Sequence, residues 1–445
     1  MEQILKKWSC VGAALLLAPA QPHAADASFP VAWQSTVELA AGRGERGPWR
    51  QNDSRYDYVD DPTVALDARG DVFVAWVDQA RKDVLLVRVP AGAAAARGAP
   101  VNVSRSPATF SWLPRIALAA AAPQKVFVLW QEIIFSGGSH GGDILFARSD
   151  DGGKTFAPPL NLSISIGGDG KGRINREIWD NGSSDIVAAA DGATIYVAWT
   201  EYDGPLWLSR SSDGGRTFAP PWQIQRGKGA PPARAPSLAL APDGTLYLAW
   251  TVGENEKADI QVASSADGGA SFSTSSAVAP SRNYADAPAL AVDHRGTVHL
   301  AYAQSSGGPF ARYDIRYTRS TDRARTFEQA REISRPAPKG FRSAAFPALA
   351  VDARGNVYAS WDLFTDRRGQ PQATGFAVSR DAGTRFTTPM LVPGSGAAGA
   401  TNGSHQGLLM RKLAVNDAGA VALVNSSLKA GERSRVWLLR ASVTR

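Results

Sequence analysis

The sequence has a single cysteine, three methionines and five histidines among its 445 residues. The cysteine, Cys10, lies in the N-terminal segment, so the rest of the chain has no thiol. This excludes disulfide scaffolds, thiol nucleophiles and cysteine-based zinc sites from the body of the protein. The histidines are scattered, and only His140-Gly141-Gly142-Asp143 gives a weak indication of a metal ligand set. We therefore expect neither a metal site nor a cofactor.

Patterns that mark several other protein classes are also missing. The chain has no glycine-rich phosphate loop and no serine-centred nucleophile elbow. The net charge is +7, but its lysines and arginines are dispersed rather than clustered, unlike a nucleic-acid-binding surface. A dispersed positive charge of this size fits weak attraction to anionic surfaces or glycans. We expect no nucleic acid partner.

Residues 1–27 have the features of a secretory signal peptide. Lys6 and Lys7 precede a short apolar run at 11–18, and small residues follow at 18–20 and 25–27. The apolar run is too short to span a bilayer, so we expect no stable membrane insertion. We predict an exported protein, periplasmic or secreted, in which residues 28–445 fold as a single, monomeric domain.

A short polar pattern, Ser-x-Asp-x-Gly-x-Thr-Phe, recurs five times, each time after an apolar alternating run. Its aspartates are Asp151, Asp213, Asp267, Asp322 and Asp381. The pattern suits a tight turn, because Asp accepts hydrogen bonds from nearby backbone N–H groups and glycine permits a positive φ. Ser and Thr hydroxyls can bind further loop groups, and Phe begins the next strand. Five evenly spread copies indicate a repeated structural unit rather than a single site, so we assign these aspartates a structural role.

A second repeat is a pair of strands joined by a tight turn. Between Pro236 and Trp250, an apolar strand leads through Asp243-Gly244 into an alternating strand. The other copies end at Trp76, Trp130, Trp199, Tyr302, Trp361 and near Val424. Seven copies of a four-stranded unit predict an all-β propeller of antiparallel blades, with six blades as the alternative if a degenerate end copy packs elsewhere. We expect the strand-ending tryptophans to pack between blades.

The two ends of the chain complement each other. The chain ends on a third strand, Val436–Arg440, so the last blade lacks its outer strand. An unassigned N-terminal strand, Val31–Val37, could supply it. Because such pairing removes an open sheet edge, we predict that the N-terminal strand closes the last blade.

The repeated turn resembles the Asp-box, also called the bacterial neuraminidase repeat, of the sialidase-like β-propellers. Two copies match at every defined position and three depart at one position each. With the flanking strands, the resemblance covers nearly the whole mature chain. It implies a propeller with Asp-box turns between third and fourth strands. It does not by itself imply sialidase activity, since Asp-boxes also occur in non-catalytic propellers.

The variable loops predict where a ligand would bind. Loops that enter the inner strands, and loops that join second to third strands, lie around the axis on the face opposite the turns. We assign ligand binding to Arg55, Tyr56, Trp112, Arg115, Trp179, Arg234 and Arg342, with Trp112 and Trp179 expected in loops. For any single one of these residues a solvated loop side chain is the simpler interpretation, so the prediction rests on their convergence.

The resemblance also implies what a catalytic version would need. A sialidase holds the sugar carboxylate with three arginines, and it uses a Tyr nucleophile beside a Glu, with an Asp as acid/base. The candidates are Arg115, Arg234 and Arg342 for the clamp, Tyr284 or Tyr56 with Glu177 or Glu201 for the nucleophile pair, and Asp57 or Asp60 for the acid. The family's Arg-Ile-Pro signature is missing, since Pro114-Arg115-Ile116-Ala117 lacks the final proline and falls in the second repeat. Seven repeats in place of six are a further departure.

Three functions from different classes stay open. The one we favour is a propeller that binds a glycan or other small anionic ligand at the axial loop face without turnover. The alternatives are an exo-acting sialidase-type glycoside hydrolase and a non-catalytic scaffold for a protein partner. A tight arginine triad beside a Tyr–Glu pair would favour the enzyme. Arg and Trp side chains at the mouth without that pair would favour the binding protein. An exposed apolar patch would favour the scaffold.

Overall fold

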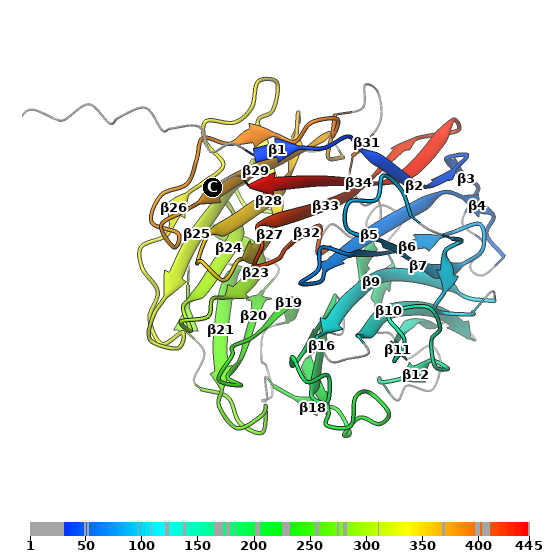
Figure 1. Ribbon diagram of the computed structural model, residues 1–445, viewed down its shortest axis with the longest axis horizontal. Helices are drawn as coiled ribbons and strands as arrows, with labels where there is room; N and C mark the ends of the chain where they lie inside the picture. Colours follow the sequence, from blue (N-terminus) through cyan, green and yellow to red (C-terminus); the bar gives the residue numbers. More distant parts are fainter. Residues whose placement is uncertain are drawn as a thin grey trace, which may run out of the picture.

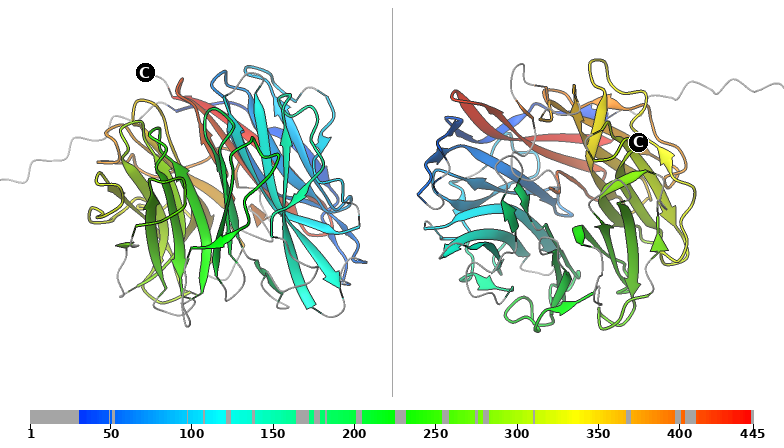
Figure 2. Two further views of the ribbon diagram at one scale, coloured as in Figure 1. Left: turned by 90° about the horizontal axis from the view of Figure 1, so that it is seen from below. Right: turned by 180° about the vertical axis from the view of Figure 1, so that it is seen from behind.

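The computed structural model describes residues 31–443, except for gaps at 49, 51–52, 97, 107, 121–123, 137–138, 164–171, 175–178, 182, 201–204, 225–231, 254–257, 274–275, 279–282, 310, 367–369, 397–400 and 403–409. Every regular element in these described ranges is a β-strand. Figure 1 shows the strands gathered into blades around a central axis, and Figure 2 shows the ring from below and from behind. Across the described ranges we find no helix long and apolar enough to cross a membrane.

Seven antiparallel blades of four strands form the ring, as predicted from the repeats. Blades 1 to 3 are β5 (Val59–Leu66), β6 (Val72–Asp78), β7 (Asp83–Val89), β8 (Val101–Asn102); β9 (Phe110–Ala119), β10 (Lys125–Ser136), β11 (Ser139–Ser149), β12 (Leu160–Asn161); and β15 (Ser184–Ala188), β16 (Ile195–Thr200), β17 (Leu206–Ser211), β18 (Trp222–Gln223). Blades 4 to 6 are β19 (Ala233–Leu240), β20 (Leu246–Val252), β21 (Asp259–Ser265), β22 (Ser276–Ala277); β23 (Tyr284–Val292), β24 (Val298–Ser305), β25 (Asp314–Ser320), β26 (Arg331–Glu332); and β27 (Ser343–Val351), β28 (Val357–Phe364), β29 (Ala373–Ser379), β30 (Met390–Leu391).

Blade 7 is built from both ends of the chain, which confirms the predicted closure. Its inner three strands are β32 (Leu413–Val415), β33 (Ala420–Lys429) and β34 (Arg433–Val443), and β31 (Thr401–Asn402) pairs with β33. The N-terminal segment forms two short strands, β1 (Val31–Trp33) and β2 (Val37–Gly42), and both pair antiparallel with β34. Figure 1 shows β1 and β2 in blue beside β34 in red. Two ribbons, β3 (Glu45–Arg46) with β4 (Tyr56–Asp57) and β13 (Gly172–Ile174) with β14 (Trp179–Asn181), complete the strands.

The apolar core is divided among the interfaces between neighbouring blades. Each interface holds one cluster, and the cluster between blades 7 and 1, for example, joins Trp76 to Val436 and Leu438. The strand-ending tryptophans lie in these clusters and are at most 3% exposed: Trp76, Trp130, Trp199, Trp250 and Trp361. Burial of a large aromatic side chain at the same position of successive blades explains their recurrence. The predicted packing role is confirmed.

The repeated turns join third to fourth strands and lie together on one face, here called the turn face. In the turn between β17 and β18, Asp213 accepts hydrogen bonds from the Thr217 backbone N (3.0 Å), the Thr217 hydroxyl (2.6 Å) and the Arg216 backbone N (3.0 Å). In the last turn, where Arg385 replaces Thr, its Nε donates to Asp381 at 3.0 Å instead. The turn phenylalanines pack into the interface with the preceding blade: Phe156, Phe218, Phe272, Phe327 and Phe386. Each turn therefore fastens its own loop and anchors its blade to the neighbour.

A β-bulge marks the opposite, loop-face end of five inner strands. In each, a residue with φ between 51° and 55° is followed by proline: Asp61, Leu113, Ala235, Ala287 and Phe346. The pairing register shifts at these points. A bulge bends its strand and redirects the flanking side chains. The inner strands therefore extend further toward the loop face than the sequence predicted, and Trp112 lies inside β9, not in a loop as we expected.

Candidate functional site

The axis of the ring is an open channel of about 410 Å³. The inner strands of all seven blades line it. Most of the lining is aliphatic, with side chains such as Val64, Leu66, Leu118, Leu240, Leu290 and Val415. The inner strands begin at the loop face and end at the turn face. The aliphatic side chains near their ends therefore line the half of the channel closer to the turn face.

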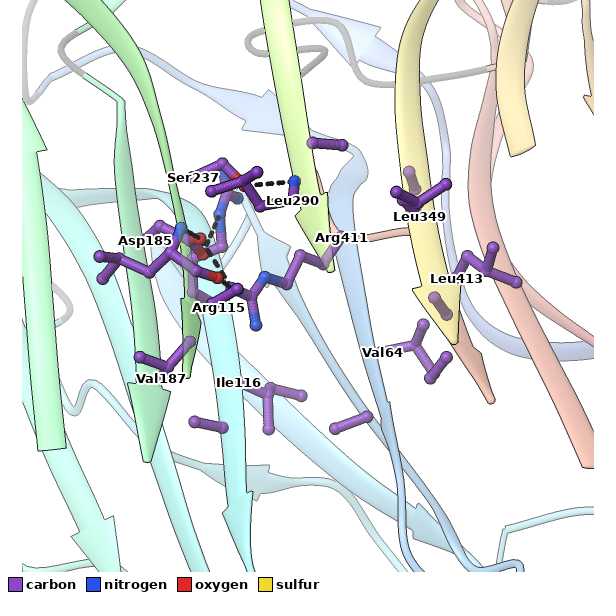
Figure 3. A pocket seen from close by; sticks show the side chains of 18 of the residues that line it. Val64, Arg115, Ile116, Asp185, Val187, Ser237, Leu290, Leu349, Arg411 and Leu413 are labelled. Carbon is purple, nitrogen blue, oxygen red and sulfur yellow. Dashed lines mark hydrogen bonds and ion pairs between the residues drawn. The ribbon is translucent and has the colours of Figure 1, made fainter. Parts of the chain in front are cut away.

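Three charged side chains line the loop-face end of this channel (Figure 3). Arg411 donates from Nη2 to Asp185 at 2.7 Å, and Arg115 Nε lies 4.0 Å from the other oxygen of Asp185. Arg115 and Asp185 are almost fully buried, and burial lowers the pKa of Arg115 to about 10 although Asp185 opposes the shift. A guanidinium with this pKa stays charged at neutral pH, so Asp185 is shared by two cations.

Arg411 crosses the channel. It precedes β32 of blade 7, yet its Nη2 reaches Asp185 of blade 3 and the carbonyl of Leu238 (3.1 Å) in blade 4. Its own carbonyl accepts the backbone N–H of Val64 in blade 1 at 3.0 Å. Figure 3 shows the side chain extending across to Asp185. The bridge therefore joins opposite sides of the ring.

The neighbours of Arg411 extend this connection. Met410 Sδ accepts a hydrogen bond from Arg115 Nη1 at 2.8 Å, and this bond connects blade 7 to blade 2. Lys412 donates to the buried Asp362 of blade 6 at 2.6 Å. We call residues 410–412 the axial hub, since they link blade 7 to blades 1, 2, 3, 4 and 6.

A second polar network lies between blades 4 and 5. Arg234 donates from Nη2 to the Tyr284 hydroxyl (2.6 Å) and from Nε to Asp286 (3.2 Å), and Tyr284 donates to Asp286 at 3.0 Å. Thr251 also donates to Asp286, at 2.9 Å. Burial, followed by the Asp286 carboxylate, raises the pKa of Tyr284 well above its usual range. The phenol therefore keeps its proton, and the network is internally satisfied.

A third region, the blade 1 pocket, is a cavity of about 940 Å³ on the loop face. It lies between the segment before β5 and the loop that joins β6 to β7. Arg50, Arg55 and Lys82 line it with Tyr56, and Asp53 is the one acidic side chain among its described lining residues. Arg50 and Arg55 are exposed, and Tyr56 packs its half-buried ring against Phe110 at 5.4 Å between centroids. The pocket therefore combines an excess of positive charge with an aromatic wall.

One buried atom of the blade 1 pocket lacks a partner. Gln79 is 1% exposed and donates from Nε2 to the carbonyl of Ser111 at 3.2 Å. Its Oε1 has no hydrogen-bond partner among the described residues. A buried acceptor left unpaired carries a free-energy cost unless a ligand or water satisfies it.

The structure separates the predicted arginine clamp into different surroundings. Arg115 lies at the axial hub and Arg234 in the network with Tyr284. Arg342 is exposed before β27, where its carbonyl accepts from Arg312 Nε at 2.8 Å. Trp112 is fully buried beside Met410 and cannot contact a ligand without rearrangement.

The predicted acids are engaged as well. Arg43 donates to Asp57 from its backbone N (3.0 Å) and its Nε (2.7 Å), and these bonds lower the pKa of Asp57. Asp60 is buried in β5 and accepts from the Ser426 hydroxyl at 2.6 Å. Glu177 and Glu201 lie outside the described residues, as do the side chains of Trp179 and His140. Among the described residues no cluster of His, Cys, Asp or Glu could hold a metal ion.

Sequence reasoning missed Arg411, Lys412 and Asp185. Lys412 stands directly before the apolar run Leu413–Val415, as Arg115 stands before Ile116–Leu118 in blade 2, and this register could have indicated Lys412. Arg411 corresponds to Pro114 of blade 2 and has no such signal. Asp185 has no such signal either, because its partners come from blades 2, 4 and 7.

A comparison with protein-family models finds no match, and neither does one with curated proteins. Among solved structures, the chain is similar to a PL25 ulvan lyase bound to -[GlcA(1-4)Rha3S]- (12% identity, TM-score 0.59, 90% of this chain and 95% of that one). It is also similar to the polysaccharide lyase Uly1 (10% identity, TM-score 0.54, covering 93% and 100%). A Hadza microbial sialidase, Hz136, has 16% identity and a TM-score of 0.48 over 83% and 73% of the two chains, which is too low to carry an argument. At these identities the likeness establishes the β-propeller fold alone.

Proposed function

We propose that this protein binds an acidic polysaccharide, one that carries carboxylate or sulfate groups, in the blade 1 pocket. The observation that carries the proposal is the lining of this pocket, where Arg50, Arg55 and Lys82 surround Tyr56 with Asp53 as the one acid among the described lining residues. Guanidinium groups bind planar anions bidentately, and a tyrosine ring can pack against a sugar face.

Further features support a carbohydrate ligand. The similar PL25 lyase is bound to -[GlcA(1-4)Rha3S]-. Export, which residues 1–27 predict, would place the chain among extracellular or periplasmic polysaccharides. The turns' resemblance to the Asp-box also supports a glycan-related propeller.

The test is a titration of the purified protein with a sulfated, glucuronate-containing oligosaccharide, and with a neutral oligosaccharide of the same length. We expect the acidic ligand to bind and Arg55→Ala to weaken it about tenfold or more, since hydrogen bonds to charged groups contribute about 1.5–3 kcal/mol. Arg323→Ala is the matched control, because Arg323 is an exposed arginine that pairs with Asp243 away from the pocket. Equal affinity for the two ligands, or an unchanged affinity in Arg55→Ala, would refute the proposal.

We propose binding without sialidase turnover. Tyr284, the candidate nucleophile, is buried, donates a hydrogen bond to Asp286 and has a raised pKa, which opposes attack as a phenolate. We therefore expect no hydrolysis of a fluorogenic sialic acid glycoside. Hydrolysis that disappears in Tyr284→Phe would instead establish the enzyme. The scaffold alternative has little support, because Leu391 is the one large hydrophobic side chain that is exposed in the described ranges.

A further inference from the structure

The axial channel combines two properties that the proposed glycan site does not use. Its wall is aliphatic along the inner strands, as in Leu118, Leu240 and Val415, while its loop-face end carries Arg115, Asp185 and Arg411. Two guanidinium groups and one carboxylate leave the charged lining with one excess positive charge. Small-molecule sites in proteins are mostly apolar cavities with a few convergent polar groups, and about 410 Å³ lies within their usual volume range.

Arg411 has hydrogen-bonding capacity left over. Its bonds to Asp185 and Leu238 both use Nη2. Its Nε and Nη1 donors have no protein acceptor in the described part of the chain, and the side chain is 34% exposed. Arg115, by contrast, is buried and contacts Asp185 and Met410. Arg411 is therefore the group that can receive a ligand acceptor.

The position of Arg411 is also fixed. Its backbone carbonyl accepts Val64 N at 3.0 Å and the Thr63 hydroxyl at 3.3 Å, and Lys412 beside it is paired with the buried Asp362. Because the Arg411 backbone is held at its carbonyl and its guanidinium is bonded through Nη2 to Asp185 and Leu238, the side chain loses little further freedom when it binds an anion. The hub thus presents a preorganised cation above an apolar channel.

We propose that the axial channel binds a small amphipathic acid, with its carboxylate accepting from the unoccupied Nη1 of Arg411 and its aliphatic body along the inner strands. The carboxylate forms a charge-assisted pair with the guanidinium, and the body removes apolar surface from water. An alcohol of the same length keeps the body and loses the charge, and an amine reverses the charge. The site is separate from the blade 1 pocket and does not depend on the proposed function.

Isothermal titration of the purified protein with octanoate, octan-1-ol and octylammonium tests this site. We expect octanoate to bind at least about tenfold more tightly than octanol, and octylammonium not to bind, because a lost charged hydrogen bond costs about 1.5–3 kcal/mol. Arg411→Met should reduce octanoate affinity to that of octanol. Arg323→Ala is again the control and should bind octanoate as the parent does.

A second variant keeps the test decisive if Arg411→Met does not fold, which circular dichroism would reveal. Ala289→Leu fills part of the channel without altering the hub, so it should weaken octanoate and octanol alike. No binding of octanoate to the parent, equal affinity for octanoate and octanol, or parent-like octanoate binding by Ala289→Leu would each overturn the proposal.

Discussion

At the scale of single residues, two glycines with the same φ allow the cost of backbone strain to be distinguished from the cost of a steric clash. Gly383 and Gly244 both have φ +84°, but a Cβ on Gly383 would stand 1.7 Å from the Tyr317 hydroxyl, whereas nothing lies within 4 Å of one on Gly244. We expect Gly244→Ala to lower the free energy of unfolding by about 1–2 kcal/mol, the cost of a left-handed alanine. Gly383→Ala should lose about 1–3 kcal/mol more through overpacking, because Tyr317 is buried and bonded to His299 at 2.6 Å.

Urea denaturation of the two variants measures this difference. Ala324 already occupies the corresponding turn position of blade 5 with φ +62°, so the fold accepts alanine there where space permits. Equal destabilisation by Gly383→Ala and Gly244→Ala would show that Tyr317 yields and that backbone strain alone sets the cost.

Residues that repeat were predictable, and residues that act across the ring were not. The tryptophan series was assigned to packing because each member holds the same place in its repeat, and burial confirms it. Arg411 binds Asp185, 226 positions away, and no local pattern marks that pair. Arg115, one of the predicted candidates, does lie at the charged end of the channel, but its partners Asp185 and Arg411 come from other blades and were not predicted.

At the scale of elements, the N-terminal strands carry the closure of the ring. β1 and β2 cover the outer edge of β34, with pairs from Val31 with Val443 to Gly42 with Ser434. Deleting residues 31–42 would expose that edge, and unpaired edges promote association with other chains. We expect the truncated protein to aggregate and to unfold at lower urea concentration, measured by light scattering and by denaturation.

The control for this truncation is Arg433→Ala. It removes the exposed ion pair between Arg433 and Glu38 on the same strands and leaves the backbone pairing intact. A surface pair contributes about 0–1 kcal/mol, so the variant should stay monodisperse and nearly as stable as the parent. A truncated chain that remains monodisperse with parent-like stability would contradict the closure argument.

The alternation of apolar residues and the turn residues predicted which segments form strands. They did not predict where the inner strands begin. Proline normally counts against a strand interior, so the sequence predicts segments such as Trp112-Leu113-Pro114-Arg115 as a loop followed by a strand. The bulge lets proline occupy the inner edge while pairing with the second strand continues on either side. The repeated residue-Pro step at the start of inner strands was the available signal, and it also explains why Asp60 and Trp112 are buried.

At the scale of the whole molecule, ring closure rests on both the paired ends and the axial hub. The blade number followed from counting repeats, since each blade is an independent copy of one local unit. The hub depends on which residues meet at the axis once the ring is closed, and that arrangement has no counterpart within a single repeat. Lys412 with Asp362 and Arg411 with Asp185 therefore could not be paired from sequence alone.

Acid stability is a property of the ring as a whole, because the same turn recurs around it. Hydrogen bonds from the Ser271 hydroxyl and backbone lower the pKa of Asp267 to about 2, and those from Thr217 and Thr326 lower the pKa values of Asp213 and Asp322. A carboxyl whose pKa is lower in the folded than in the unfolded state stabilises the fold above its ordinary pKa, and this contribution is lost as the pH falls toward the folded value. We expect the urea midpoint to be steady near neutral pH and to fall between about pH 4 and pH 2. Replacing all three by Asn should lower the midpoint at pH 7 and flatten this acid slope, whereas Asp53→Asn, at an exposed aspartate outside the turns, should do neither. If the triple variant kept the parent's slope, acid sensitivity would have to arise from carboxyl groups outside the turns.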